Sequence, residues 1–442
     1  MLRKLLNKLV QGHKQEQKQT ENAANIPFTG QLSVDERQVR SIFHNCGDVI
    51  YRSLKVPALG NRRALLVFVD TLVSHETINR DVIAGLISQP LDAGQSIGNI
   101  LDLISVGEAN WYNSPDEIKY PVLTGMVLIL VEGSARALSL EARQWPSRAV
   151  EEPEQERIIQ GPREGFNENL LTNLGLIRRR LPTPSLKIES IIVGRRTSSE
   201  VALIYLEDVS DPDVVEEVRG RIQAVDIDGI LDPGALGELI ADQGGSPFPL
   251  LLNTERPDKA VGELMQGKVV LLVQGSPYAK IMPVTFADFN QSPEDYYIHP
   301  VFATLTRFLR FVSFFIATSV TAVYTAIITF HYEMIPRDIV VFIAETRAGV
   351  PFAPFIEAFF LELSIELIRE ASLRLPGPIG QTIGIVGALV LGQAVVNARL
   401  VSPVMLIVVA IGFMTSFTIP NYEASLPVRY LRFPLILTAS FL

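Results

Sequence analysis

The spacing of hydrophobic and polar positions changes once along the chain. Up to about residue 290, short apolar runs such as LLVFVD (residues 65–70) precede helix-like stretches such as HETINRDVIAGLI (residues 75–87). From Phe311 onward the apolar runs lengthen, and FVSFFIATSVTAVYTAIITF holds 20 residues without a charge, enough to cross the hydrocarbon core of a bilayer. The pattern predicts an α/β region followed by an all-α helical transmembrane domain.

The α/β region repeats its own order of elements. GMVLILVEGS and ARALSLEAR form a hairpin-like pair after the first strand and helix, and GKVVLLVQGS and PYAKIMPV do the same after VALIYLEDVSDPDVVEEVRGRI. Asp70 and Gly133 are 63 positions apart, and Asp208 and Gly275 are 67 positions apart. Order and spacing therefore both recur, which predicts two related α/β subdomains.

These patterns divide the chain into five parts. We expect a mobile N-terminal arm at 1–30, a first subdomain at 31–150, a linker and bridging helix at 151–184, a second subdomain at 185–300 and the transmembrane helical domain at 301–442.

The bridging helix is expected within GPREGFNENLLTNLGLIRRR. Asn167 is a suitable N-cap, and one face is apolar, with Leu170, Leu171, Leu174 and Ile177. The last turn carries Arg178, Arg179 and Arg180, where the helix dipole favours cations. Two interpretations stay open: a helix with a solvated basic end, or a contact for an anion or a lipid headgroup.

About five hydrophobic segments are expected in the last part. They are residues 311–330, 351–368, 379–396 and 401–419, and an incomplete one that begins near Phe433, ten residues before the end. If residues 351–368 span the membrane, six arginines fall on one side (Arg307, Arg310, Arg369, Arg374, Arg429 and Arg432) and three on the other (Arg337, Arg347 and Arg399). Because arginine and lysine are enriched in cytoplasmic loops, the α/β subdomains are predicted to be cytosolic.

One of these segments carries charges. FFLELSIELIRE (359–370) places Glu362, Glu366, Arg369 and Glu370 along one stripe of a helix. A charge at membrane depth costs about 3 kcal/mol or more unless it faces protein or water. The stripe is therefore expected to face inward. It either forms interhelical ion pairs, lies in the membrane interface, or lines a water-filled path.

Charge and motifs exclude several functions. From Phe308 to Leu442 there are eight arginines, no lysine and eight acids, so the net charge of −9 lies entirely in the first two thirds. An acidic region of this kind is a poor nucleic-acid binder. Cys46 is the only cysteine, which fits a reducing compartment and excludes an intrachain disulfide. No phosphate-binding loop, dinucleotide fingerprint, zinc spacing or nucleophile motif is present, so no enzyme activity, cofactor or metal is expected.

Six stretches resemble the A subunit of GerA-type spore germination receptors, in that family's order. They are GPREGFNENLLTNLGLIRRR, SPFPLLLNTERPDKA, QSPEDYY, TFHYEMIP, RLPGPIGQTIGIVGALVLGQAVV and SFTIPNY. The resemblance begins at about residue 35 and covers nearly all of the chain that follows. The family differs in continuing past the equivalent of Leu442 with further hydrophobic sequence and a polar tail.

The resemblance implies a subunit of the spore inner membrane that works with a transporter-like B subunit and a lipoprotein C subunit. Nutrients trigger such receptors, and release of monovalent cations follows. The A subunit would form a homo-oligomer around an ion path in the lipid bilayer.

Our hypothesis is a non-enzymatic receptor subunit with a nutrient-gated cation path. Glu362 and Glu366 would attract cations, Leu363 would form an apolar constriction, and Arg369 would pair with an acid near the cytosolic mouth. Phe359 and Glu370 complete the candidate lining. Two alternatives are a secondary transporter subunit that works by alternating access, for which no inverted repeat is visible, and a membrane-tethered enzyme, for which the residues of a catalytic site are lacking.

Overall fold

The structure is a computed structural model that describes residues 27–88, 97–144, 152–153, 156–242, 245–374 and 392–441. Most of the predicted arm (1–30) and of the predicted span at 379–396 lies outside these residues. The chain forms two compact units. The first comprises Met1–Glu154, Pro162–Ala241 and Thr254–Pro283, and the second comprises Gln155–Gly161, Asp242–Asn253 and Val284–Leu442.

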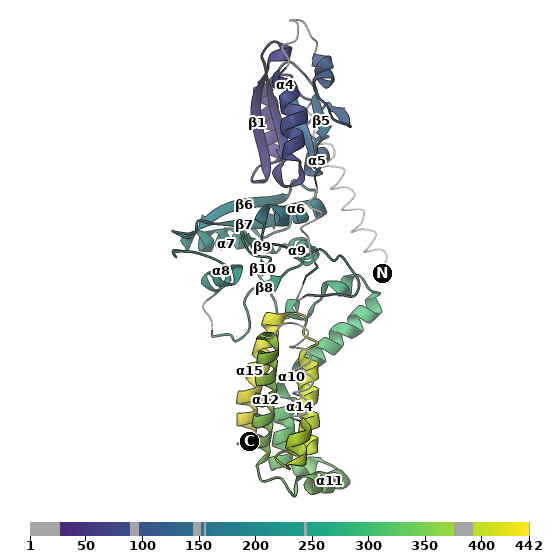
Figure 1. The fold of residues 1–442 in the computed structure, drawn as a ribbon, viewed down its shortest axis with the longest axis vertical. Coiled ribbons are helices and arrows are strands. Elements are labelled where there is room, and N and C mark those ends of the chain that lie inside the picture. Colours follow the sequence, from purple (N-terminus) through teal and green to yellow (C-terminus); the bar gives the residue numbers. More distant parts are fainter. Residues whose placement is uncertain are drawn as a thin grey trace, which may run out of the picture. The chain divides into compact units, whose positions relative to one another are not determined.

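A five-stranded antiparallel sheet forms the first part of the first unit (Figure 1). Its strands are β1 (Val49–Val56), β2 (Arg62–Val69), β3 (Ala109–Tyr112), β4 (Met126–Val131) and β5 (Ala137–Glu141), in the order β1-β2-β4-β5-β3. The accompanying helices are α2 (Leu32–Ile42), the short α3 (His75–Thr77), α4 (Ala84–Ser88) and α5 (Lys119–Leu123).

Alternation along β2 gives this sheet two buried faces. Leu66 and Phe68 pack with the helical segment that contains Ile78 and Val82. Leu65 and Val67 point to the other face and pack with residues of α2 and α5. Such a strand reads as a continuous apolar run, which is why LLVFVD is recognisable in the sequence.

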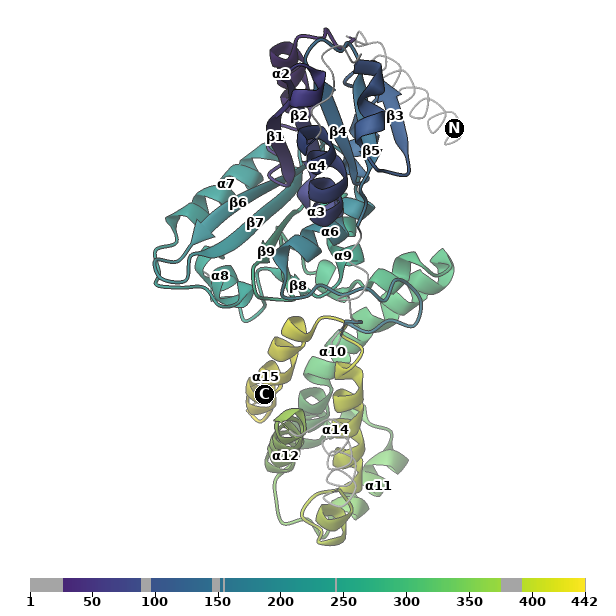
Figure 2. The ribbon, with the colours of Figure 1, turned by 45° about the horizontal axis from the view of Figure 1, so that its top comes forward.

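A second five-stranded sheet follows (Figure 2). It contains β6 (Leu186–Val193), β7 (Ser199–Leu206), β8 (Leu252–Thr254), β9 (Val269–Val273) and β10 (Ala279–Met282), in the order β6-β7-β9-β10-β8. Its helices are α6 (Leu170–Arg180), α7 (Pro212–Ala224), α8 (Pro233–Ile240) and α9 (Pro257–Leu264).

The two sheets have the same topology, since β6 to β10 take the places of β1 to β5. The recurrence extends to single glycines. Gly133 lies two residues after β4 and Gly275 two residues after β9, and both have φ of 90°, a left-handed conformation that glycine adopts without strain. The repeat predicted from the sequence is confirmed at the level of strand order, whereas the exact domain boundaries stay predictions.

The start of α6 differs from the prediction. Asn169, not Asn167, caps the helix, because the helix begins at Leu170 and the Asn169 side chain accepts a hydrogen bond from the Thr172 amide. The side chain of Asn167 instead accepts a hydrogen bond from the Asn169 amide. Leu171 is 52% exposed and does not belong to the buried face.

The main α-helices of the second unit are α10 (Pro300–Phe330), α11 (Arg337–Arg347), α12 (Pro354–Arg374), α14 (Pro403–Ser416) and α15 (Tyr422–Ala439). Helices α10, α12, α14 and α15 pack side by side and are called the helical bundle below (Figure 1). Among the described residues, α10 is the one helix that is long and apolar enough by itself to cross a membrane.

The last helix is longer than the sequence indicated. We expected a segment that begins near Phe433, but α15 begins at Tyr422, where Asn421 accepts a hydrogen bond from the Ala424 amide and so caps the helix. Hydrophobicity did not reveal its first turns because they carry Glu423, Arg429 and Arg432. These two arginines are almost fully buried.

Candidate functional site

Four carboxylates of α12 each pair with an arginine. The pairs are Glu357 with Arg347, Glu362 with Arg432, Glu366 with Arg429 and Glu370 with Arg374. We call them the ion-pair array. Its acids follow one another at intervals of four or five residues, so they run along α12 on neighbouring turns.

The pair of Glu362 and Arg432 lies at the centre of the helical bundle. Its nitrogen and oxygen are 3.2 Å apart, and its side chains are 3% and 4% exposed. The Thr321 hydroxyl on α10 donates to the other carboxylate oxygen at 2.8 Å. The Arg432 guanidinium also donates to two backbone carbonyls, Ala317 of α10 and Gly412 of α14. One ion pair thus connects all four helices of the bundle.

The next charged group along α12 is arranged differently. Glu366 is 19% exposed and pairs with Arg429 of α15. Arg369 was predicted to pair with an acid, but its guanidinium donates to the Ser416 hydroxyl at 3.0 Å. It also lies over the rings of Phe413 and Phe417, 4.6 and 4.8 Å from their centroids, a favourable cation–π geometry.

The remaining predicted residues of α12 are more exposed. Phe359 and Leu363 are 38% and 42% exposed, as is Leu367, which was not predicted, at 63%, and the Glu370 side chain is 51% exposed. The Phe359 ring contacts that of Phe433 edge to face, with centroids 5.4 Å apart. The predicted stripe therefore divides into an inward charged part and an outward part that is apolar up to Glu370.

Sequence reasoning missed the partners of the acids. Arg429 and Arg432 entered the prediction only as markers of topology, although two arginines three positions apart in an apolar C-terminal segment resemble the acid spacing on α12. Glu357, whose side chain is fully buried, pairs with Arg347 of α11 at 2.7 Å and was also missed.

The three arginines at the end of α6 have protein partners. The side chain of Arg178 is fully buried and donates to both oxygens of Asp48 at 2.8 Å. Burial acts to lower the pKa of Arg178, but the carboxylate of Asp48 outweighs it and raises the pKa, so the guanidinium is charged. Arg178 is therefore closed to solvent and to any headgroup.

Arg179 and Arg180 share a single acid, Glu164. Burial acts to raise the pKa of Glu164, but the two guanidiniums outweigh it and hold that pKa below its usual value.

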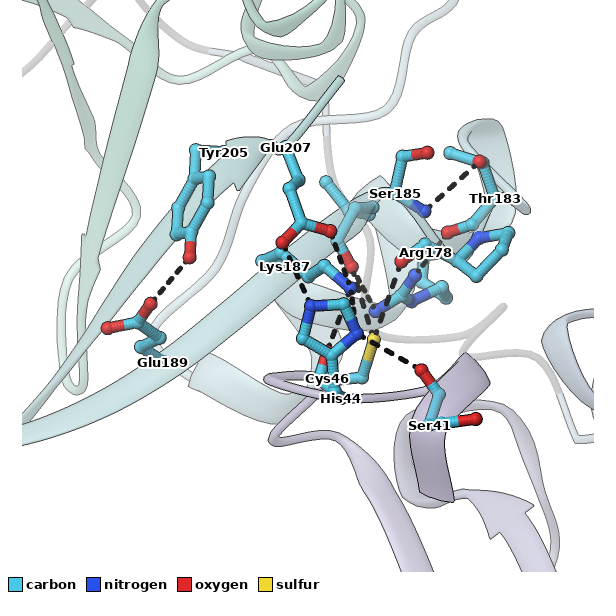
Figure 3. Close-up of polar contacts among 12 residues, drawn as sticks. Ser41, His44, Cys46, Arg178, Thr183, Ser185, Lys187, Glu189, Tyr205 and Glu207 are labelled. Atoms are coloured by element: carbon cyan, nitrogen blue, oxygen red, sulfur yellow. Dashed lines mark hydrogen bonds and ion pairs between the residues drawn. The ribbon is translucent and has the colours of Figure 1, made fainter. Parts of the chain in front are cut away.

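Arg178 lies where the two subdomains of the first unit meet (Figure 3). There Cys46 forms a parallel bridge with Ile188 of β6, and the Gly47 amide donates to the Ile188 carbonyl at 2.8 Å. A single parallel bridge thus joins the first subdomain to the edge strand of the second sheet.

Polar side chains also connect the two subdomains at this junction. The Lys187 ammonium is buried and donates to the His44 carbonyl at 2.8 Å and to Glu207 at 3.1 Å (Figure 3). Burial raises the pKa of the Cys46 thiol, so the thiol stays protonated. In the described part of the chain, no group of three His, Cys, Asp or Glu side chains is placed to hold a metal ion.

A model of the family described as GerA, "Bacillus/Clostridium GerA spore germination protein", matches residues 37–442. The chain is 38% identical to spore germination protein GerLA of Bacillus cereus, over 94% of this chain and 85% of that protein. It is 34% identical to YfkQ of Bacillus subtilis (strain 168), described as an uncharacterized membrane protein, over 96% of this chain and 82% of that protein.

A solved structure is also similar. It is the crystal structure of the N-terminal domain of the A subunit of the Bacillus megaterium spore germinant receptor GerK3, with 28% identity, a TM-score of 0.46, and coverage of 60% of this chain and 98% of that one.

These sequence matches define the class of protein as a spore germination protein. This chain belongs to the GerA family, as the family match over residues 37–442 and the identity to GerLA show.

We predict that Glu362 and Arg432 stabilise the helical bundle only as a pair. Arg432→Met leaves a buried carboxylate unpaired and is expected to cost about 3–5 kcal/mol of unfolding free energy. The double variant Glu362→Gln with Arg432→Met removes both charges and should regain most of that loss. Chemical unfolding of the full chain in detergent, followed by circular dichroism, measures both variants. Arg374→Met, which breaks the exposed pair with Glu370, is the matched control and should change little. Equal stability of the three variants would refute the prediction.

We also predict that Arg178 holds the two subdomains together. Arg178→Met leaves Asp48 buried without a partner, so the amides of Gly47 and Ile188 should exchange hydrogen at least tenfold faster, which corresponds to about 1.4 kcal/mol. Hydrogen exchange on the intact chain, read by mass spectrometry on peptides that cover 44–50 and 185–190, measures this effect. Arg195→Met breaks an exposed pair with Asp226 and should leave both peptides unchanged. Unchanged protection in the Arg178 variant would contradict the assignment.

Proposed function

We propose that this chain is the A-type subunit of a nutrient germinant receptor in the spore inner membrane, with its two α/β subdomains in the cytosol. In this proposal it assembles with a transporter-like B subunit and a lipoprotein C subunit. It also oligomerises in the bilayer around a path for monovalent cations that opens when nutrient is sensed. The role is non-enzymatic. Membership of the GerA family supports the receptor role, and the arrangement of α12 supports the path.

The observation that carries the path is the division of α12 into two faces. Glu362 and Glu366 are neutralised by Arg432 and Arg429 within one chain, so they are not free to attract cations in this conformation. We assign them the role of holding α12 against α15. The outward face, with Phe359 and Leu363, is then the surface available to other copies and to the path.

An apolar ring is a suitable closed gate. Side chains such as leucine, brought together by several copies, exclude water from a narrow pore, and ions cannot cross a dewetted constriction. In this proposal Leu363 forms that constriction and Phe359 lies one turn away from it. Glu370, which is 51% exposed, supplies negative charge at the end of the same face and favours cations over anions.

We predict that Leu363→Ser opens the path without nutrient, because a hydroxyl at the constriction holds water and lowers the barrier to ions. Dormant spores in which the variant replaces the wild-type subunit should release potassium severalfold faster than wild-type spores in nutrient-free buffer. Val323→Ser is the matched control, since Val323 is an aliphatic residue of α10 with 50% exposure. Equal potassium release by spores that carry either variant would show that Leu363 does not form the gate.

A further inference from the structure

The first three turns of α10 present an apolar face that no described residue covers. Its members are Val301, Phe302, Leu305, Phe308 and Leu309, whose exposed fractions are 65%, 63%, 55%, 61% and 56%. These positions follow the spacing i, i+1, i+4, i+7 and i+8, so they lie on one side of the helix. We call them the α10 apolar face.

The opposite side of the same turns is fixed to the protein. Arg307 and Arg310 both pair with Asp295, at 3.0 and 2.7 Å, and the Asp295 side chain is fully buried. Arg307 also lies over the Tyr296 ring, 5.1 Å from its centroid. These contacts set the rotation of the helix, so the α10 apolar face must point away from the segment that contains Asp295.

The length of α10 decides where these turns lie in a membrane. Its 31 residues make a helix of about 46 Å, whereas the hydrocarbon core is about 30 Å thick. Tilt alone would have to reach about 50° to bury the helix, beyond the roughly 40° limit observed for membrane helices. At the average tilt of about 20°, the residues of α10 before Phe311 extend about 15 Å beyond the hydrocarbon core.

The uncharged stretch from Phe311 to Phe330 fills the hydrocarbon core. The turns before Phe311 then start at the edge of the hydrocarbon core and run outward through the headgroup layer of the leaflet where α10 begins. Tryptophan and tyrosine favour that layer, and Tyr296 and Tyr297, just before α10, are 63% and 43% exposed. The α10 apolar face is also continuous along one helix with the predicted span.

We propose that the α10 apolar face binds the lipid surface, with Phe308 and Leu309 at the boundary between headgroups and acyl chains and Val301 and Phe302 farther out among the headgroups. This inference rests on the membrane location in the proposed function. It goes beyond that proposal because it makes residues 300–309 an interfacial element, held by the two arginines on Asp295, that sets the depth and rotation of α10. A segment of this kind gains stability from burying apolar area among lipids.

Tryptophan quenching by lipids tests the assignment. The full chain is reconstituted in phosphatidylcholine and phosphatidylglycerol vesicles, with Trp111 and Trp145 replaced by Phe and one reporter introduced. Phe308→Trp is the main reporter and Leu309→Trp is a second one in case the first does not fold. Acyl chains brominated near the headgroup are expected to quench either reporter more than chains brominated near their ends. Thr306→Trp, on the other side of the helix, should be quenched less.

A reporter in the predicted span of α10 separates the interfacial assignment from the membrane location on which it rests. Val323→Trp should be quenched best by deep bromines if α10 crosses the membrane. If Val323→Trp is quenched while Phe308→Trp is not, the interfacial assignment is overturned and the membrane location stands. Unquenched blue-shifted emission from Phe308→Trp would then indicate that a protein surface covers the face, and red-shifted emission that water does. If neither reporter is quenched, the membrane location fails and the inference fails with it.

Discussion

A buried carboxylate needs a buried cation, and the helical bundle is arranged around this requirement. A buried charge that loses its partner costs about 3–5 kcal/mol, a large part of the stability of an ordinary domain. Glu362 and Arg432 meet this requirement for each other, and Thr321 together with the carbonyls of Ala317 and Gly412 adds three further hydrogen bonds. Because those groups belong to four helices, the pair fixes which face of each helix points inward.

The first unit also contains a buried ion pair, at the junction of its two subdomains. Asp48 and Arg178 are fully buried between two sheets, and the guanidinium also donates to the carbonyls of Thr183 and Leu186. Removing one partner of such a pair is costly, whereas an apolar replacement of both is often tolerated. Pairs of this kind therefore specify an arrangement more strongly than they stabilise it. Here they specify how the two subdomains meet at the bridge between Cys46 and Ile188 and how α12 turns toward α15.

The sequence was most informative where a pattern is local. Strands such as LLVFVD are buried on both faces and read as apolar runs, so the repeated sheets could be predicted from order and spacing alone. The charged stripe on α12 was also predictable, because helical periodicity places Glu362 and Glu366 together. Its partners were not, since Arg429 and Arg432 are more than sixty positions away and nothing local marks a long-range ion pair. The burial of Arg178 was missed for the same reason, because its partner Asp48 lies 130 positions earlier.

The central claim is that α12 turns its charges inward and its apolar face toward a water-filled path between copies. Single-cysteine accessibility tests it most directly, in a Cys46→Ser background and with a membrane-impermeant thiol reagent applied to assembled receptor complexes. Cysteines at Phe359, Leu363 and Glu370 are expected to react, and cysteines at Ala358 and Leu361, which are 0% and 2% exposed, are expected to be protected. Protection at all five positions would place the outward face of α12 against lipid or protein, and would contradict the account.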